Sequence, residues 1–262
     1  MGMNYALVTG ASKGIGKEIA YQLAQRKINL VLVARSADLL TTVASAIKNK
    51  FSVEVKTLAL DLSKPAAAQE VFDFCAKNNL NINILINNAG YGLWGNFEKL
   101  SLDEMNNMMQ LNMNLVVSLC HYFVPTLKQN APSYIMNVCS TAAYQAVPYL
   151  SVYAASKAFV LLFTRGLRHE LKEYGISVTC LSPGSTDTNF TNRARMNERL
   201  QKTAAKFNMK PTDVAKAAVE AMFKGKAEVL PGLTNLVSAK AAEIFPKNMS
   251  ESIAKKLYQP DK

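Results

Sequence analysis

Short apolar runs rich in β-branched residues alternate with longer segments of helical periodicity along most of the chain. The predicted strands are residues 5–9, 29–34, 53–60, 82–87, 134–139, 176–181 and 227–231. The predicted helices are residues 15–27, 37–49, 66–77, 101–129, 152–174 and 211–224. Near-continuous apolar strands are buried on both faces, and parallel strands need crossover connections. This order therefore predicts an α/β fold: a doubly wound parallel sheet of about seven strands inside a three-layer α/β/α sandwich.

The chain shows no internal repeat, low-complexity linker or shift in composition that would mark a boundary, so we expect residues 1–262 to form one domain. Its longest apolar runs fall short of the roughly 18 residues needed to cross a bilayer. The N-terminal sequence MGMNYALVTG lacks the features of a signal peptide. We expect a cytoplasmic protein without a transmembrane segment.

Cysteine and charge patterns argue against several kinds of site. The four cysteines lie far apart with no C-x-x-C pair, and only two histidines could join them, so we expect buried thiols and neither a metal site nor disulfides. The net charge is +11, and 14 Lys or Arg against 7 Asp or Glu follow residue 190. No dense basic run is interleaved with aromatic residues, so we expect no nucleic-acid partner. Attraction to an anionic cofactor, substrate or lipid surface stays open.

The first predicted strand runs directly into a glycine-rich turn, T-G-A-S-K-G-I-G, and then into a helix. Gly10 suits a tight turn, Gly14 lets the backbone approach a pyrophosphate, and Gly16 allows close packing of helix and strand. The helix N-terminus adds free N–H groups and partial positive charge. Strand, turn and helix in this order predict a dinucleotide-binding site in a Rossmann-like fold.

The spacing G-x-x-x-G-x-G resembles that of the short-chain dehydrogenase/reductase family, in its compact single-domain branch. Further motifs of the family follow in the expected order as far as residue 188: Asp61-Leu62, N-N-A-G at Asn87 to Gly90, Asn112, Ser140, Tyr153 with Lys157, and Pro183-Gly184. The stretch STAAYQAVPYLSVYAASKAFVLLF is most similar to a bacterial subgroup named after ketoacyl reduction or D-alanine transfer.

The resemblance implies where a nicotinamide cofactor binds. The implied contacts are Gly10, Ser12, Lys13, Gly14, Ile15, Gly16, Arg35, Asp61, Leu62, Asn88, Ala89, Gly90, Tyr153, Lys157, Pro183, Gly184, Thr186 and Thr188. At the end of the second strand, where an acidic residue would hold the ribose of NAD, the sequence has Ala34 and then Arg35. A guanidinium pairs well with phosphate, and Lys13 adds a second cation, so we expect NADP(H).

Tyr153 and Lys157 stand at i and i+4, where a lysine on the same helix face lowers the pKa of a phenol. The spacing alone also fits a solvated lysine on an amphipathic helix. The resemblance implies that Tyr153 is the general acid or base and that Lys157 lowers its pKa and binds the nicotinamide ribose. It further implies that Ser140 donates a hydrogen bond to the substrate oxygen and that Asn112 holds a water; Asn114 is the alternative to Asn112.

These residues predict an NADPH-dependent oxidoreductase that reduces a ketone, aldehyde or 3-oxoacyl group to an alcohol, or catalyses the reverse reaction. A non-catalytic NADP(H)-binding sensor or scaffold is the alternative; a sugar-nucleotide epimerase or dehydratase is disfavoured because its turn and larger C-terminal domain are missing. The expected substrate wall is mostly apolar, which suits an apolar or aromatic carbonyl: Leu93, Trp94, Ala142, Ala143, Tyr144, Val147, Tyr149, Leu150 and Phe190.

Two segments extend beyond the expected sheet and helices. Residues 188–210 form a polar, basic insertion that we predict to be a lid. Residues 232–260 form a helical extension with a second helix at 250–258, which would be a cap over the substrate site, a subunit interface or a peripheral membrane contact. The resemblance also implies a homodimer or homotetramer that packs through residues 101–129 and 152–174.

Overall fold

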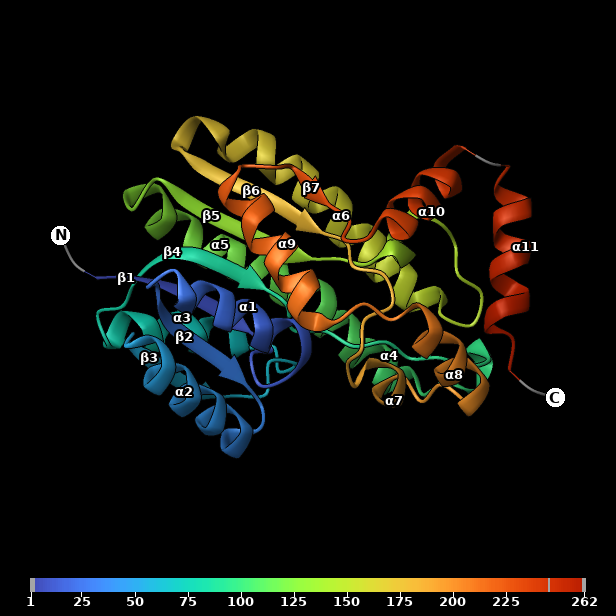
Figure 1. Cartoon of the computed structure of the whole chain (residues 1–262), viewed down its shortest axis with the longest axis horizontal. Helices are drawn as coiled ribbons and strands as arrows, with labels where there is room; N and C mark the ends of the chain where they lie inside the picture. The colour runs from blue at the N-terminus through green and yellow to red at the C-terminus, as the bar shows by residue number, and fades with distance from the viewer. Residues whose placement is uncertain (1–2, 245, 261–262) are drawn as a thin grey trace.

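The computed structural model, which describes residues 3–244 and 246–260, is built on one parallel sheet with the strand order β3-β2-β1-β4-β5-β6-β7 (Figure 1). The strands are β1 (Asn4–Thr9), β2 (Asn29–Ala34), β3 (Val55–Ala59), β4 (Asn81–Asn87), β5 (Ser133–Val138), β6 (Ile176–Leu181) and β7 (Glu228–Val229). The predicted α/β fold is confirmed. Strands β3 and β7, at the two edges, are shorter than predicted.

Helices cover both faces of the sheet, as the near-continuous apolar strands require. One face packs against α1 (Gly14–Gln25), α2 (Ala37–Phe51) and α9 (Pro211–Phe223). The other packs against α3 (Ala67–Lys77), α5 (Leu115–Gln129) and α6 (Ser151–Leu171). Successive residues of β1 point to opposite faces, so Leu7 lies in one core and Val8 in the other.

The strand order reverses between β1 and β4, because β2 and β3 lie on one side of β1 and β4 to β7 lie on the other. Helix connections leave these two strands in opposite directions, which opens a crevice at the carboxyl ends of the strands. The glycine turn follows β1, and the N-N-A-G motif follows β4. Both motifs are therefore brought together at this reversal.

The predicted helix at 101–129 is interrupted. The structure has α4 (Leu102–Met109), a π-helical turn (Gln110–Asn114) and then α5. A π turn inserts one extra residue and shifts the helical register, a distortion common at functional sites. Within this turn Asn112 is fully buried, whereas Asn114 is exposed.

The two extra segments are helical and lie beyond the carboxyl ends of the strands (Figure 1). The predicted lid contains α7 (Phe190–Arg193) and α8 (Glu198–Phe207). The C-terminal extension contains α10 (Leu233–Ile244) and α11 (Lys247–Tyr258), so its second helix begins three residues earlier than predicted. Among the described residues, 3–244 and 246–260, no helix is both long and apolar enough to cross a bilayer.

Candidate active site

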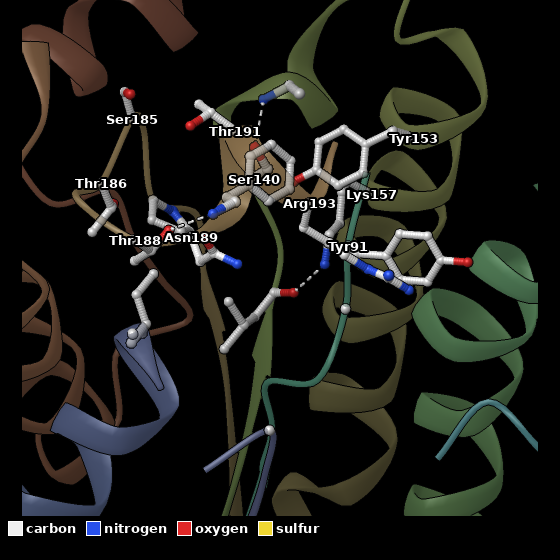
Figure 2. A pocket seen from close by; sticks show the side chains of 18 of the residues that line it. Tyr91, Ser140, Tyr153, Lys157, Ser185, Thr186, Thr188, Asn189, Thr191 and Arg193 are labelled. Atoms are coloured by element: carbon white, nitrogen blue, oxygen red, sulfur yellow. Dashed lines mark hydrogen bonds between the residues drawn. The ribbon is translucent and has the colours of Figure 1, made fainter. Parts of the chain in front are cut away.

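A cavity of about 700 Å³ lies at the carboxyl ends of the strands. Its walls come from the glycine turn, the ends of β4 and β5, helix α6, the segment 183–207 and the C-terminal helices. Every predicted catalytic and cofactor-binding residue lines it except Gly16 and Asn112. The predicted substrate wall is only partly correct: four of its residues line the cavity (Ala142, Val147, Leu150 and Phe190), whereas five do not (Leu93, Trp94, Ala143, Tyr144 and Tyr149). In Figure 2, Ser140, Tyr153 and Lys157 lie on one side of the pocket and Ser185, Thr186 and Thr188 on the other.

The glycine turn has the backbone geometry expected of a phosphate cradle. Gly10 and Gly14 have positive φ angles of 65° and 54°, which favour glycine. The Asn88 side-chain amide holds the turn by donating to the carbonyls of Thr9 (2.8 Å) and Gly10 (3.2 Å). Asn88 therefore links the N-N-A-G motif to the turn, a structural role that the sequence prediction did not assign to it.

Gly16 lies beneath the turn, where a side chain has no room. A Cβ there would meet the Asn88 amide and the Gly10 carbonyl oxygen. The third glycine therefore allows α1 to pack closely against the turn and the Asn88 side chain. Its contribution to a bound cofactor is therefore indirect, through the shape of the turn.

We predict that Gly16→Ala lowers the free energy of unfolding by about 1–3 kcal/mol, because the new methyl group overpacks the turn. Dinucleotide affinity falls with it. Chemical denaturation and cofactor titration measure the two effects. Gly166→Ala is the matched control, since a Cβ at Gly166 meets nothing within 4 Å. Equal behaviour of the two variants would contradict the tight packing of the turn.

The two cations expected to select the cofactor are exposed and line the cavity. Arg35 follows β2, and Lys13 precedes α1. One carboxylate faces this region: hydrogen bonds from Ser63 and then the Arg35 charge hold the pKa of Asp61 below its usual range. Asp61 accepts from the Ser63 hydroxyl (2.8 Å) and backbone N–H (3.1 Å), so its carboxylate already has partners of its own.

Tyr153 is buried, and its ring stands 5.2 Å from that of Phe190. Burial raises the pKa of the Tyr153 phenol, and a hydrogen bond from Ser140 opposes this rise only in part. The expected lowering by Lys157 is therefore wrong for the chain by itself. The physical reason is desolvation, which penalises the phenolate more than the nearby groups stabilise it.

Lys157 is also buried, at 4% exposure, and its ammonium donates to the Val138 carbonyl (2.9 Å). Its Nζ lies 5.9 Å from the centre of the Tyr153 ring. Burial lowers the pKa of Lys157. The i, i+4 spacing does bring the lysine to the tyrosine, which excludes the solvated-lysine reading.

Asn112 lies behind the cavity wall. Its amide oxygen accepts from the Tyr91 backbone N–H (3.1 Å), and its amide nitrogen donates to the Tyr91 carbonyl (2.9 Å) and the Ser156 hydroxyl (3.0 Å). A Cβ at Gly90 would meet both the Asn112 oxygen and the Lys157 ammonium, so both groups lie close to Gly90. Asn114 instead donates to the Gln110 side chain at the surface, so of the two alternatives Asn112 is the one that lies beside the cavity wall.

The segment 188–210 lies over Tyr153 and is held by three kinds of contact. Phe190 packs on the Tyr153 ring and fills the space that a side chain at Gly92 would need. Arg195 forms a two-pronged ion pair with Glu104 of α4 (2.6 and 3.0 Å). The Trp94 backbone N–H donates to the Ala194 carbonyl (3.1 Å).

The C-terminal helix contributes to the far wall of the cavity. The Trp94 indole donates to the Tyr258 carbonyl (2.7 Å) across 164 residues of sequence, and the Tyr258 side chain lines the cavity. Burial raises the pKa of Tyr258. Sequence reasoning did not assign Tyr258, Leu257, Phe207 or Ala239 to the site, although all four line the cavity. For Tyr258, Leu257 and Ala239 the helical periodicity of the extension was the only signal, whereas Phe207 ends α8 in the segment 188–210.

A sequence model of the short chain dehydrogenase family matches residues 4–199. Very-long-chain 3-oxoacyl-CoA reductase of Rattus norvegicus is 35% identical over 185 residues, which are 68% of this chain and 58% of the relative. The chain thus spans less than two thirds of that relative's length. An uncharacterized oxidoreductase of Staphylococcus aureus is 28% identical over 221 residues, 84% of this chain and 91% of the relative.

Solved structures agree over nearly the whole chain. A short-chain dehydrogenase from Sphingobium yanoikuyae in complex with NADPH has a TM-score of 0.82 at 27% identity and covers 99% of this chain and 98% of its own. L-Sorbose reductase from Gluconobacter frateurii, complexed with NADPH and L-sorbose, has a TM-score of 0.78 at 26% identity, covering 88% and 96%.

Proposed function

Because the chain belongs to the short-chain dehydrogenase family, we propose that it is an NADPH-dependent oxidoreductase that reduces a carbonyl group to an alcohol, or catalyses the reverse reaction. The observation that carries this proposal is the grouping of Ser140, Tyr153 and Lys157 in one cavity beside the glycine turn. Acid–base groups and a dinucleotide cradle thereby share one space, as hydride transfer to a carbonyl requires.

The residues of the cavity fit a nicotinamide dinucleotide. The positive φ angles of Gly10 and Gly14 and the N-terminus of α1 suit the pyrophosphate. We assign Asp61 and Leu62 to the adenine, and Asn88, Ala89, Gly90, Pro183, Gly184, Thr186 and Thr188 to the remainder of the cofactor. Arg35 and Lys13 support NADP(H) over NAD(H), and the structural relatives from Sphingobium and Gluconobacter bind NADPH. The cofactor supplies the hydride.

Tyr153 holds the proton that the new alcohol needs. As hydride reaches the carbonyl carbon, negative charge develops on the oxygen, and preorganised donors stabilise it. The Tyr153 hydroxyl gives its proton to that oxygen, and the Ser140 hydroxyl donates a hydrogen bond to it. Burial raises the pKa of Tyr153, so the phenol of the chain by itself is protonated at neutral pH and holds the proton that this step needs.

Lys157 and Asn112 act behind Tyr153. We assign the Lys157 ammonium to the nicotinamide ribose. Asn112 fixes the Tyr91 backbone next to Gly90 and shapes the floor beside the lysine. One observation supports a water held by Asn112: its amide oxygen lies close to Gly90. The amide oxygen and the amide nitrogen already have protein partners.

The substrate side of the cavity supports an apolar or aromatic carbonyl compound. The side chains around Tyr153 are mostly apolar: Leu111, Ala142, Val147, Leu150, Phe190, Met196, Leu200, Ala204, Phe207, Ala239, Ala242 and Leu257. The rat relative is named for very-long-chain 3-oxoacyl-CoA and the Gluconobacter relative for L-sorbose, so the family itself spans apolar and polar substrates. The lining favours the apolar class here.

We further propose that the chain acts as one domain, with residues 188–210 as a lid and 232–260 as a cap over the substrate. The Phe190, Arg195 and Trp94 contacts support this. A cytoplasmic homodimer or homotetramer is the proposed working form. Exposed apolar side chains on α4 and α6, Leu102, Phe159 and Leu162, support packing of a second copy there.

The proposal is tested by following the absorbance of NADPH, and separately of NADH, with a panel of ketones, aldehydes, quinones and 3-oxoacyl thioesters. We expect oxidation of NADPH with apolar carbonyl compounds and slower oxidation of NADH. Tight binding of NADPH without reduction of any panel member would overturn the proposal and favour a cofactor-binding sensor.

A further inference from the structure

The C-terminal helices carry apolar stripes that no other part of the described chain covers. Along α10, Leu233, Val237 and Ile244 are 76%, 59% and 82% exposed. Along α11, Met249, Ile253 and Leu257 recur every four residues, and Ile253 is 64% exposed. Side chains four apart share one helix face, so each helix presents an apolar stripe to its surroundings. Single exposed apolar residues are common, but aligned stripes on consecutive helices mark an interaction surface.

Basic residues surround these stripes. Residues 233–260 hold four lysines and two glutamates, and Lys240, Lys255 and Lys256 are exposed; helical spacing places Lys240 and Lys256 beside the apolar positions. Helix α8 adds the exposed Lys206, next to Phe207. Apolar side chains framed by lysines are typical of helices that lie in the interface of an anionic membrane.

The same surface borders the mouth of the cavity. Phe207 at the end of α8 is 71% exposed, and Leu257 of α11 is 40% exposed, yet both also line the cavity. An apolar path therefore leads from the exposed stripes into the space around Tyr153. In Figure 1, α8, α10 and α11 all lie at the end of the molecule opposite the N-terminus.

We propose that the surface formed by α10, α11 and the end of α8 docks on an anionic lipid membrane without crossing it. Charge decides between this occupant and a second copy of the chain. In a dimer formed through this surface, the lysines of the two copies would repel one another. Acidic lipid headgroups instead attract the lysines, and the apolar side chains enter the acyl region.

Docking in this way turns the cavity mouth toward the bilayer, so that an apolar carbonyl compound enters from the lipid; this last step rests on the proposed function. Docking itself does not rest on the proposed function, because it needs only the exposed surface of α8, α10 and α11. The two are therefore tested by separate measurements.

The test is cosedimentation of the full chain with vesicles of phosphatidylglycerol and phosphatidylcholine in equal parts, and with vesicles of phosphatidylcholine alone. We expect binding to the anionic vesicles that weakens as salt rises. Ile253→Ser combined with Val237→Ser, and separately Lys255→Glu combined with Lys256→Glu, should each weaken binding about tenfold or more.

Helix α2 supplies matched controls at the opposite end of the molecule. Leu39→Ser, and Lys48→Glu combined with Lys50→Glu, change exposed residues of the same kinds and should leave vesicle binding unchanged. None of the exchanged residues lines the cavity, so NADPH oxidation with a water-soluble carbonyl compound should persist in all variants. Absence of vesicle binding, equal loss in the α2 variants, or a change of oligomeric state caused by the α10–α11 variants would overturn the docking proposal.

Discussion

Tyr153→Phe is expected to slow carbonyl-dependent NADPH oxidation by about 10²–10⁴-fold, the range that a positioned general acid contributes. The exchange removes only the hydroxyl. The ring that packs against Phe190 at 5.2 Å stays, so the fold and the lid contact should be preserved. NADPH affinity should change by less than about tenfold, since the loss concerns a proton needed in the transition state. Single-turnover rates and cofactor titration separate the two quantities.

Tyr258 provides the matched control, because it is a half-buried tyrosine of the same cavity whose pKa burial also raises. Tyr258→Phe removes a hydroxyl from the substrate wall, and we expect a change in rate of less than about tenfold. If the two variants lose activity equally, the cavity depends on its general polarity, and the acid role of Tyr153 fails. If Tyr153→Phe keeps full activity, another group supplies the proton.

The raised pKa of Tyr153 can be measured by following the absorbance of its phenolate. Burial favours the neutral phenol, so the cofactor-free protein should keep Tyr153 protonated to a pH above that of a free tyrosine. The phenolate absorbance of the parent minus that of Tyr153→Phe reports this titration. A phenolate that forms near neutral pH would restore the original expectation that Lys157 lowers the pKa.

The cofactor half of the site could be predicted from the sequence because its signals are local. The turn from Thr9 to Gly16 contains its own strand end, glycines and helix start, and the structure assembles them as their order requires. The sheet could also be predicted from the sequence, since each strand carries its apolar pattern within about five or six residues. Edge strands such as β7 deviate because partial burial weakens that pattern.

The substrate half could not be predicted in the same way. The Trp94 indole meets the Tyr258 carbonyl across 164 residues, and no local pattern specifies such a contact. The π turn that buries Asn112 leaves no distinct mark in the pattern of α4 and α5, because it adds one residue to otherwise helical sequence. The Tyr153 pKa was misjudged for a related reason: sequence spacing reveals the neighbouring charge but not the depth of burial.

Arg35→Asp should reverse the preference between the two nicotinamide cofactors. A guanidinium bonded to a phosphate contributes about 1.5–3 kcal/mol per charge-assisted hydrogen bond, so its replacement by a carboxylate should weaken NADPH binding about 100-fold or more. The new carboxylate stands at the end of β2, where it can accept from the ribose hydroxyl of NADH, so NADH binding should strengthen. Asp61 already accepts hydrogen bonds from Ser63 and cannot replace it.

The measurement is the dissociation constant of each cofactor by fluorescence titration, with Arg26→Asp as control. Arg26 is exposed just past the far end of α1 from the glycine turn, so it undergoes the same change of charge away from the cofactor. If only the general positive field matters, the two variants lose affinity equally, and both weaken NADPH more than NADH because NADPH carries the additional phosphate charge, the more so at low salt. A loss confined to Arg35→Asp and to NADPH instead requires a specific phosphate contact, because only the phosphate distinguishes the two cofactors. Lys13 then accounts for whatever preference for NADPH remains, since it is the second cation at the rim of the same cavity.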